Sequence, residues 1–165
     1  PKGQVQQNQG ALGNAWFVNE INIVPNADAE IAALDGFEPI NSAIVDQRFK
    51  EEIIEGLDNT NAEISLLEYK PNYLKYNSNS LKDGIAIFSE IYYDKGWNAY
   101  IDGELVPHFR ANYVLRGLQI PKGKHIVEFK FEPNTYRNGE LVSFASSLIL
   151  FLLIAFVSYK EITTS

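Results

Sequence analysis

The sequence predicts a mainly β fold with some helix (α+β). We expect an antiparallel β-sandwich with one or two short N-terminal helices, followed by a C-terminal transmembrane helix. Short segments of alternating polar and apolar residues, separated by turn residues, fill the chain from about residue 62 to 131. Helix-capping signals lie before this region, and a long uncharged stretch follows it. A length of 165 residues suffices for one globular domain with a modest core and one additional element.

The N-terminal third is expected to mix short strands and helices. Residues 1–14 are rich in Gln, Asn and Gly and are expected to be a linker or arm. Asn26 is placed to cap a short helix that ends near Gly36. The other expected elements of this region are a strand at 15–24, a short strand at 43–46 and a second short helix at 46–57.

From Ala62 onward the pattern is that of a β domain. Asp102-Gly103 is the strongest turn signal, because a tight hairpin needs positive φ at both of its central residues. We expect no strand–helix alternation that would build a parallel sheet. The expected strands are 63–70, 72–77, 84–93, 97–101, 104–108, 111–120 and 124–131.

The C-terminal stretch predicts a membrane span. Residues 141–159 (LVSFASSLILFLLIAFVSY) contain no charged side chain. As a helix, such a segment would be roughly 28 Å long, close to the thickness of the bilayer core. The segment lacks the polar face of a surface helix. The alternative to a membrane span is a helix that is fully buried in a protein core. The tail after it carries one Lys and one Glu, so charge does not decide the orientation.

Composition excludes several classes of function. Lys and Arg total 14 against 21 Asp and Glu, a net charge of −7, which disfavours a nucleic-acid partner. The absence of Cys removes disulfides and thiolate chemistry. His108 and His125 are the only histidines, and no catalytic signature motif is present. We therefore expect no cofactor, no metal site and no catalytic residue, and the absence of Met suggests a processed chain or a piece of a longer one.

One strand carries candidate binding residues. By the two-residue period, Arg110, Asn112, Val114 and Arg116 would share a face, where two guanidinium groups and an amide could hold a phosphate or sugar hydroxyls. A bulge at Gly117 would then be needed to keep the later apolar residues together. The alternative is an ordinary polar outer face paired with acidic residues of neighbouring strands.

Aromatic residues gather in the sequence before this strand. Trp97 and Tyr100 are the members that we include in the candidate substrate-binding set with Arg110, Asn112 and Arg116. Exposed rings would form a platform for carbohydrate stacking, whereas buried rings would belong to the sandwich core.

The chain from about Ala11 to Tyr159 resembles the C-terminal region of bacterial YfhO-family membrane proteins. The resemblance is carried by ALGNAWFV, NADAEIAAL and the run from FSEIYYDKGWNAYIDG to NTYRNGELVSF. Its most specific parts, in chain order, are Gly96-Trp97, Tyr100-Ile101-Asp102-Gly103, Arg110, Asn112-Tyr113, Arg116, Gly123, His125, Phe129 and Phe131-Glu132-Pro133.

This resemblance implies a large multi-span protein similar to membrane glycosyltransferases that use a polyprenyl-phosphate sugar and act on cell-envelope polymers. Together with the residue patterns above, it divides the chain into a linker at 1–14, a domain at 15–139 that the resemblance implies is extracytoplasmic, a transmembrane helix at 140–160 and a short tail at 161–165, in the bacterial cell (inner) membrane. The implied partners are the lipid bilayer, the upstream transmembrane portion, and a polyprenyl-phosphate sugar or envelope glycan. The catalytic loop of such enzymes lies outside this chain, so the expected role is non-catalytic positioning of donor or acceptor. The alternative is a membrane-anchored structural or carbohydrate-binding module without transferase activity.

Overall fold

The computed structural model describes residues 10–164, without the side chains of residues 134–138, 157, 158, 161, 162 and 164. Residues 1–9 of the expected arm lie outside the described part. The chain divides into two compact units, Pro1–Phe131 and Glu132–Ser165, which are described separately below.

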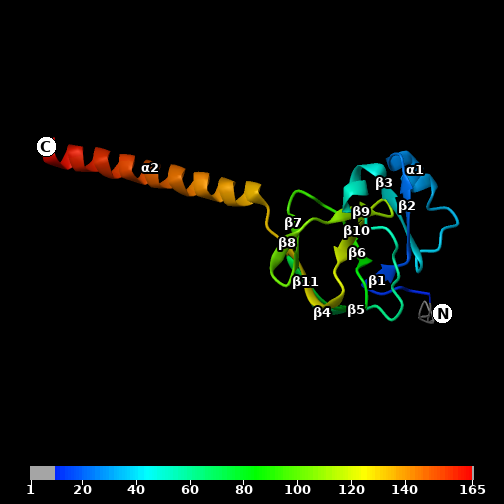
Figure 1. Ribbon diagram of the computed structural model, residues 1–165. Helices are drawn as coiled ribbons and strands as arrows, with labels where there is room; N and C mark the ends of the chain where they lie inside the picture. Colours follow the sequence, from blue (N-terminus) through cyan, green and yellow to red (C-terminus); the bar gives the residue numbers. More distant parts are fainter. Residues whose placement is uncertain (1–9, 165) are drawn as a thin grey trace, which may run out of the picture. The chain divides into compact units, whose positions relative to one another are not determined.

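Two antiparallel sheets form a β-sandwich in the first unit (Figure 1), as the sequence predicts. One sheet has four strands in the order β1-β6-β10-β9, and the other has five in the order β4-β5-β11-β7-β8. The strands of the first sheet are β1 (Ala15–Val18), β6 (Gly84–Ile91), β9 (Phe109–Ala111) and β10 (Leu115–Ile120). Those of the second are β4 (Glu63–Lys70), β5 (Tyr73–Ser80), β7 (Trp97–Ile101), β8 (Glu104–Val106) and β11 (Gly123–Phe131).

The main hydrophobic core fills the space between these two sheets. Its centre is a set of edge-to-face rings in which Phe88 lies 4.9 Å from Tyr76 and 4.8 Å from Phe129, between ring centroids. Ala86 and Phe88 of β6 face this core together with Leu118 and Ile120 of β10. Alternate residues of both strands therefore contribute to it, as the two-residue period requires.

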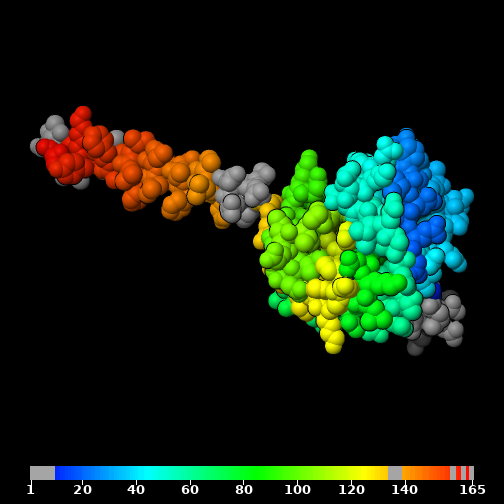
Figure 2. All heavy atoms as spheres, viewed as in Figure 1, coloured from blue at the N-terminus to red at the C-terminus, as the bar shows by residue number. Residues whose placement is uncertain are grey.

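A third layer covers the other face of the four-stranded sheet, and the sequence analysis did not anticipate it. Strands β2 (Glu20–Val24) and β3 (Ser42–Asp46) pair in parallel, with helix α1 (Ala27–Ala32) between them in the chain. The expectation that no strand–helix alternation builds a parallel pair was therefore wrong for this segment. Ile85 and Ile87 of β6 pack into a second core cluster against Val45 of this layer and other residues. Figure 2 shows the blue and cyan N-terminal third gathered on one side of the domain.

The short helices follow their capping signals. The Asn26 side chain accepts a hydrogen bond from the Ala29 N–H at 2.9 Å, as predicted for the cap of α1. The second expected helix is only a 3₁₀-helix, η1 (Gln47–Glu52), and Asp46 caps it by accepting from the Arg48 N–H. It is shorter than predicted because the chain after Glu52 leaves helical geometry at Ile53.

Two expected strands are each divided in the structure. The segment 15–24 becomes β1 and β2, which join different sheets. The segment 111–120 is interrupted by a turn at 112–114, where Asn112 and Tyr113 adopt positive φ of 49° and 69°. The hairpin at Asp102-Gly103 is confirmed, with positive φ at both residues.

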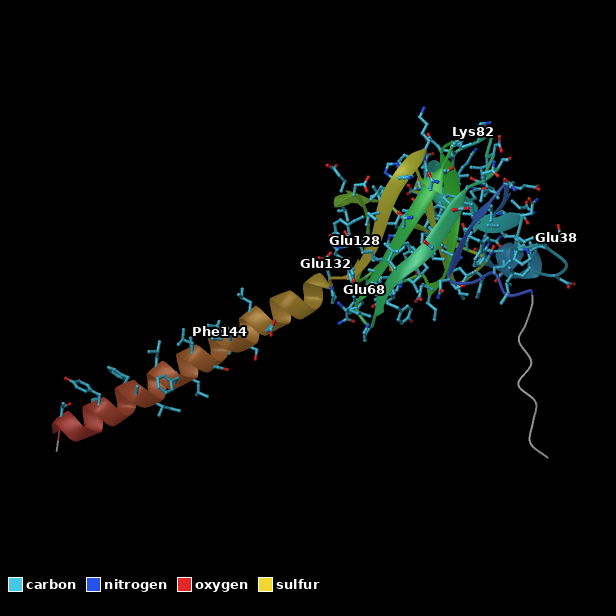
Figure 3. All side chains as sticks on the ribbon, turned by 90° about the horizontal axis from the view of Figure 1, so that it is seen from below. Glu38, Glu68, Lys82, Glu128, Glu132 and Phe144 are labelled. Atoms are coloured by element: carbon cyan, nitrogen blue, oxygen red, sulfur yellow. The ribbon has the colours of Figure 1, made fainter. Side chains whose placement is uncertain are left out.

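The second unit contains helix α2 (Asn134–Thr164). Residues Gly139–Phe156 form a window of mean hydropathy 2.1 with no buried residue, long and apolar enough to cross a membrane. Its side chains project on all sides, Phe144 among them (Figure 3). The hydroxyls of Ser146 and Ser147 donate to the carbonyls of Val142 and Ser143, four residues earlier, so these polar groups are satisfied within the helix.

Candidate functional site

The hairpin of β9 and β10 carries three of the predicted binding residues and places them differently from the expected flat face. Because the strand turns at 112–114, Arg110 and Arg116 are paired across the hairpin. Asn112 and Val114 belong to the turn, so the four residues do not form one continuous strand face. The expected bulge at Gly117 was also wrong, since the register shift lies between Leu115 and Arg116.

Asn112 fastens this turn to the N-terminal layer. Its backbone N–H donates to the Ile44 carbonyl at 2.8 Å, and its side-chain oxygen accepts from the Ile44 N–H at 2.8 Å. Asn112 is 6% exposed. Asn112 thus supplies β3 with hydrogen bonds of the kind that a neighbouring strand would make. Asparagine also tolerates the left-handed backbone conformation that the turn requires here.

Arg110 lies in a partly buried ionic network. Its Nη2 donates to Glu30 Oε2 at 2.5 Å and lies 3.7 Å from Asp46 Oδ2. The other Glu30 oxygen accepts from the Tyr113 N–H at 2.8 Å. The Arg110 guanidinium also lies over the Tyr113 ring, 5.4 Å from its centroid. Both charges are paired, as burial demands, and the network holds the hairpin turn against α1 and β3.

Arg116 is buried against aromatic rings at one end of the sandwich core. Its guanidinium carbon lies 4.2 Å from the Trp97 ring centroid and 5.1 Å from that of Phe129. Its Nε donates to the Ile91 carbonyl at 2.9 Å. The residue is only 2% exposed, and this burial lowers the pKa of its guanidinium. Trp97 is half-buried and also contacts Phe131, with 5.5 Å between ring centroids.

Buried polar atoms without a partner lie around this cluster. Within the described part of the chain they include Arg116 Nη1, Tyr76 Oη and His108 Nε2. Burial lowers the pKa of His108 to about 4 and raises that of the Tyr76 hydroxyl. Unsatisfied buried groups are rare in folded proteins, so this cluster is the part of the domain best suited to receive a further polar partner.

Tyr100 lies apart from these residues, on β7 in the five-stranded sheet. The ammonium group of Lys130 is 4.7 Å from the centroid of its ring. The neighbouring Tyr73 hydroxyl donates to Glu128, and this bond raises the pKa of Tyr73 to about 12. The structure therefore brings Trp97 and Arg116 together, places Arg110 and Asn112 in the adjoining turn, and separates Tyr100 from both.

The sequence did not reveal the partners of two residues, Glu30 beside the hairpin turn and Asp102 at the other end of β7 from Trp97. Glu30 is fully buried, although an acidic residue in the first turn of a short helix is typical of an exposed position. Asp102 binds His125 Nδ1 at 2.6 Å, so His125 has a carboxylate partner from the hairpin turn. Asp102 precedes Gly103 in a recognisable turn, but its partner could not be identified before the strand pairing was known.

A surface hollow of about 470 Å³ lies at the edge of the sandwich, remote in the chain from the hairpin residues. It is lined in part by Trp16, Asn19, Asn59, Glu63 and Ser65. No group of three His, Asp or Glu side chains within the described segments could hold a metal ion.

The fold and the last helix define the class of this molecule: a β-sandwich domain with a third layer, followed by a candidate membrane-spanning helix. Comparison with protein families matches residues 46–143 to the family described as bacterial membrane protein YfhO. The match covers more than half of the chain, and the chain belongs to the YfhO family of bacterial membrane proteins. No curated protein and no solved structure matches it.

Proposed function

We propose that this chain is a non-catalytic extracytoplasmic domain of a multi-span membrane glycosyltransferase that uses a polyprenyl-phosphate sugar, and that it helps to position donor or acceptor. Membership of a membrane-protein family and the apolar window of α2 support a location at the bilayer, where a polyprenyl-linked donor resides. The inner membrane of a bacterium is the proposed location, with residues 1–139 on its outer side.

The observation that carries the binding role is the unpaired Nη1 of Arg116. A buried guanidinium whose Nη1 has no partner among the described residues, and which lies over the rings of Trp97 and Phe129, is suited to a phosphate oxygen because arginine recognises phosphate through several N–H groups. Arg110 and Asn112 are engaged with Glu30 and Ile44, so their proposed part is to hold the turn beside Arg116 in place.

The test is sugar transfer by the full-length parent protein carrying Arg116→Met. Methionine keeps contact with Trp97 and Phe129 but has no donor, so we expect transfer to fall at least about tenfold, the effect of losing roughly 1.4 kcal/mol of binding. Lys124→Met is the control, because Lys124 is exposed and lies near the start of β11, at the opposite end of that strand from Phe131. Unchanged transfer by a folded Arg116→Met protein would remove Arg116 from substrate positioning.

The alternative is a membrane-anchored structural or carbohydrate-binding module without a part in transfer. The hollow beside Trp16 supports the carbohydrate version, since an indole offers an apolar face and the neighbouring amides and carboxylate offer hydrogen-bond partners to sugar hydroxyls. Titration of the protein with envelope sugars, compared with Trp16→Ala, distinguishes this module from the positioning domain. Sugar affinity that depends on Trp16 and unchanged transfer in Arg116→Met would together favour the module.

A further inference from the structure

One end of the sandwich carries a rim of exposed apolar side chains. This rim consists of Tyr69, Ile91, Tyr93 and Val114, which are 61%, 71%, 49% and 47% exposed. Their exposure costs solvation free energy in water, and apolar residues collected at one end of a domain indicate a contact surface.

The strand pairing places these four residues at the same end. Leu115 pairs with Ile91, so the turn containing Val114 lies beside the end of β6. The Tyr92 N–H donates to the Val114 carbonyl at 2.8 Å, which also ties the segment of Tyr93 to this turn. On the other sheet, Tyr69 lies next to the turn that leads into β5.

The last residue of β11 belongs to this same end. Phe131 pairs with Trp97, and its N–H donates to the Asn72 carbonyl at 3.0 Å. Only residues 132–138 separate Phe131 from the apolar window that begins at Gly139. Seven residues reach about 25 Å when fully extended, and roughly 15 Å when they are helical from Asn134 onward. When α2 is inserted in a membrane, Phe131 is therefore tethered within about 25 Å of the start of the span.

We propose that the rim rests in the interfacial zone of the lipid bilayer. Tyrosine is suited to this zone because its ring can lie among the lipid chains while its hydroxyl reaches water and headgroups. The contact is apolar rather than electrostatic, since the chain has a net charge of −7 and Glu68 and Glu128 lie on strands next to this end. The proposal depends on membrane insertion of α2 and not on a role in sugar transfer.

The opposite end of the sandwich supplies a matched control. Leu81 precedes β6, is 74% exposed and so resembles Ile91 at the other end of the same strand. Figure 3 shows its neighbour Lys82 at the far end of the sheets from Glu68. Leu81 and Ile91 therefore lie at opposite ends of β6 but have nearly the same exposure.

The experiment uses the absence of Cys, which makes single-cysteine labelling clean. The full chain with Ile91→Cys, Val114→Cys or Leu81→Cys is labelled with an environment-sensitive nitrobenzoxadiazole probe and reconstituted into phosphatidylcholine vesicles. A second set of vesicles contains lipid with a nitroxide near the headgroup end of the acyl chain, which quenches only probes at the interface. Thermal melting followed by tryptophan fluorescence verifies that each variant is folded.

We expect the nitroxide lipid to quench the Ile91 and Val114 probes at least about twofold more than the Leu81 probe, because only interfacial groups meet the quencher. High salt should leave this difference unchanged, since charge does not carry the contact. Equal quenching at both ends would overturn the proposal. A blue-shifted but unquenched rim probe would also overturn it, because protein and not lipid would then cover the rim. If Ile91→Cys does not fold, Val114→Cys decides the question alone.

Discussion

Glu30 and Arg110 form an ion pair that joins two layers of the domain across 80 residues of sequence. The Glu30 carboxylate has no exposed surface and also accepts the Tyr113 N–H. A short helix of the N-terminal layer thus holds the turn of a hairpin that belongs to the sandwich. The pair places the turn next to Arg116, and it makes the third layer necessary for the geometry of the candidate site.

Replacing Glu30 by Ala should therefore destabilise the domain strongly. The change leaves Arg110 and the Tyr113 N–H without their main acceptor, a loss of about 3–5 kcal/mol in the free energy of unfolding. The double variant Glu30→Leu with Arg110→Met removes both charges and should lose less than Glu30→Ala alone. Denaturant unfolding of the full chain in detergent measures both, with the surface change Glu51→Ala as control. A double variant less stable than Glu30→Ala would contradict the importance of charge pairing.

Asn112→Gly should be destabilising although glycine accepts the backbone conformation. The left-handed φ of 49° suits glycine, but the side-chain bond to the Ile44 N–H is lost, at a cost of about 1–3 kcal/mol. Asn61 provides a matched control, since it is exposed and also left-handed, with φ of 59°. Asn61→Gly should change stability by less than about 1 kcal/mol. Equal effects of the two substitutions in denaturant unfolding would show that the Asn112 side chain contributes nothing.

Stability should depend on pH through His125. Hydrogen bonds to the Asp102 carboxylate and the Lys122 carbonyl raise the pKa of His125 above its ordinary value of 6.5. Both ring nitrogens face acceptors, so the folded chain favours the doubly protonated ring. The stabilisation is complete below pH 6.5 and is lost as pH rises through the raised folded value.

Melting temperatures of the wild type should accordingly fall between pH 6 and pH 8, and His125→Gln should flatten this part of the profile. His108 acts in the opposite direction at lower pH. Its folded pKa of about 4 means that protonation favours the unfolded chain, so stability declines as pH falls from 6.5 toward 4. His125→Gln should leave this acid limb in place, and an unchanged slope between pH 6 and pH 8 would exclude His125 as its source.

Gly117→Ala should destabilise the four-stranded sheet. A Cβ at this position would overlap the ring of Phe109, which is fully buried. Such overpacking costs about 1–3 kcal/mol in the free energy of unfolding. Adding Phe109→Leu shortens the opposing side chain and should restore part of the loss. A double variant no more stable than Gly117→Ala would place the clash elsewhere.

The order and type of most elements could be predicted from the sequence because they follow local rules. Asn26 capped its helix, and Asp102-Gly103 formed its hairpin, since both depend on neighbouring backbone geometry. The parallel pairing of β2 with β3 and the burial of Glu30 depend on contacts distant in sequence. No local pattern reports such contacts.

The candidate site shows the same division. Arg116 and Trp97 could be selected by residue type, and the structure does bring them together. The burial of Arg116 could not be foreseen, because it follows from the turn at Asn112 and Tyr113, and neither residue is a glycine that would have signalled positive φ. The prediction extended a two-residue period through that turn, and it therefore placed Arg110, Asn112 and Arg116 incorrectly on one strand face.

The burial of the four-stranded sheet on both faces has a consequence for how the chain folds during synthesis. Strand β1 can pair only after β6 has been synthesised, about seventy positions later. The N-terminal layer likewise lacks its contact with Asn112 until the turn at 112–114 has been synthesised. Contacts of such long sequence separation make folding slow, because much of the chain is ordered before they form. A chain that has not yet reached residues 109–115 therefore lacks part of the cover over Ile85 and Ile87, because Phe109, Ala111 and Leu115 belong to the same core cluster. During that interval the emerging chain is open to aggregation and is a natural client for a chaperone.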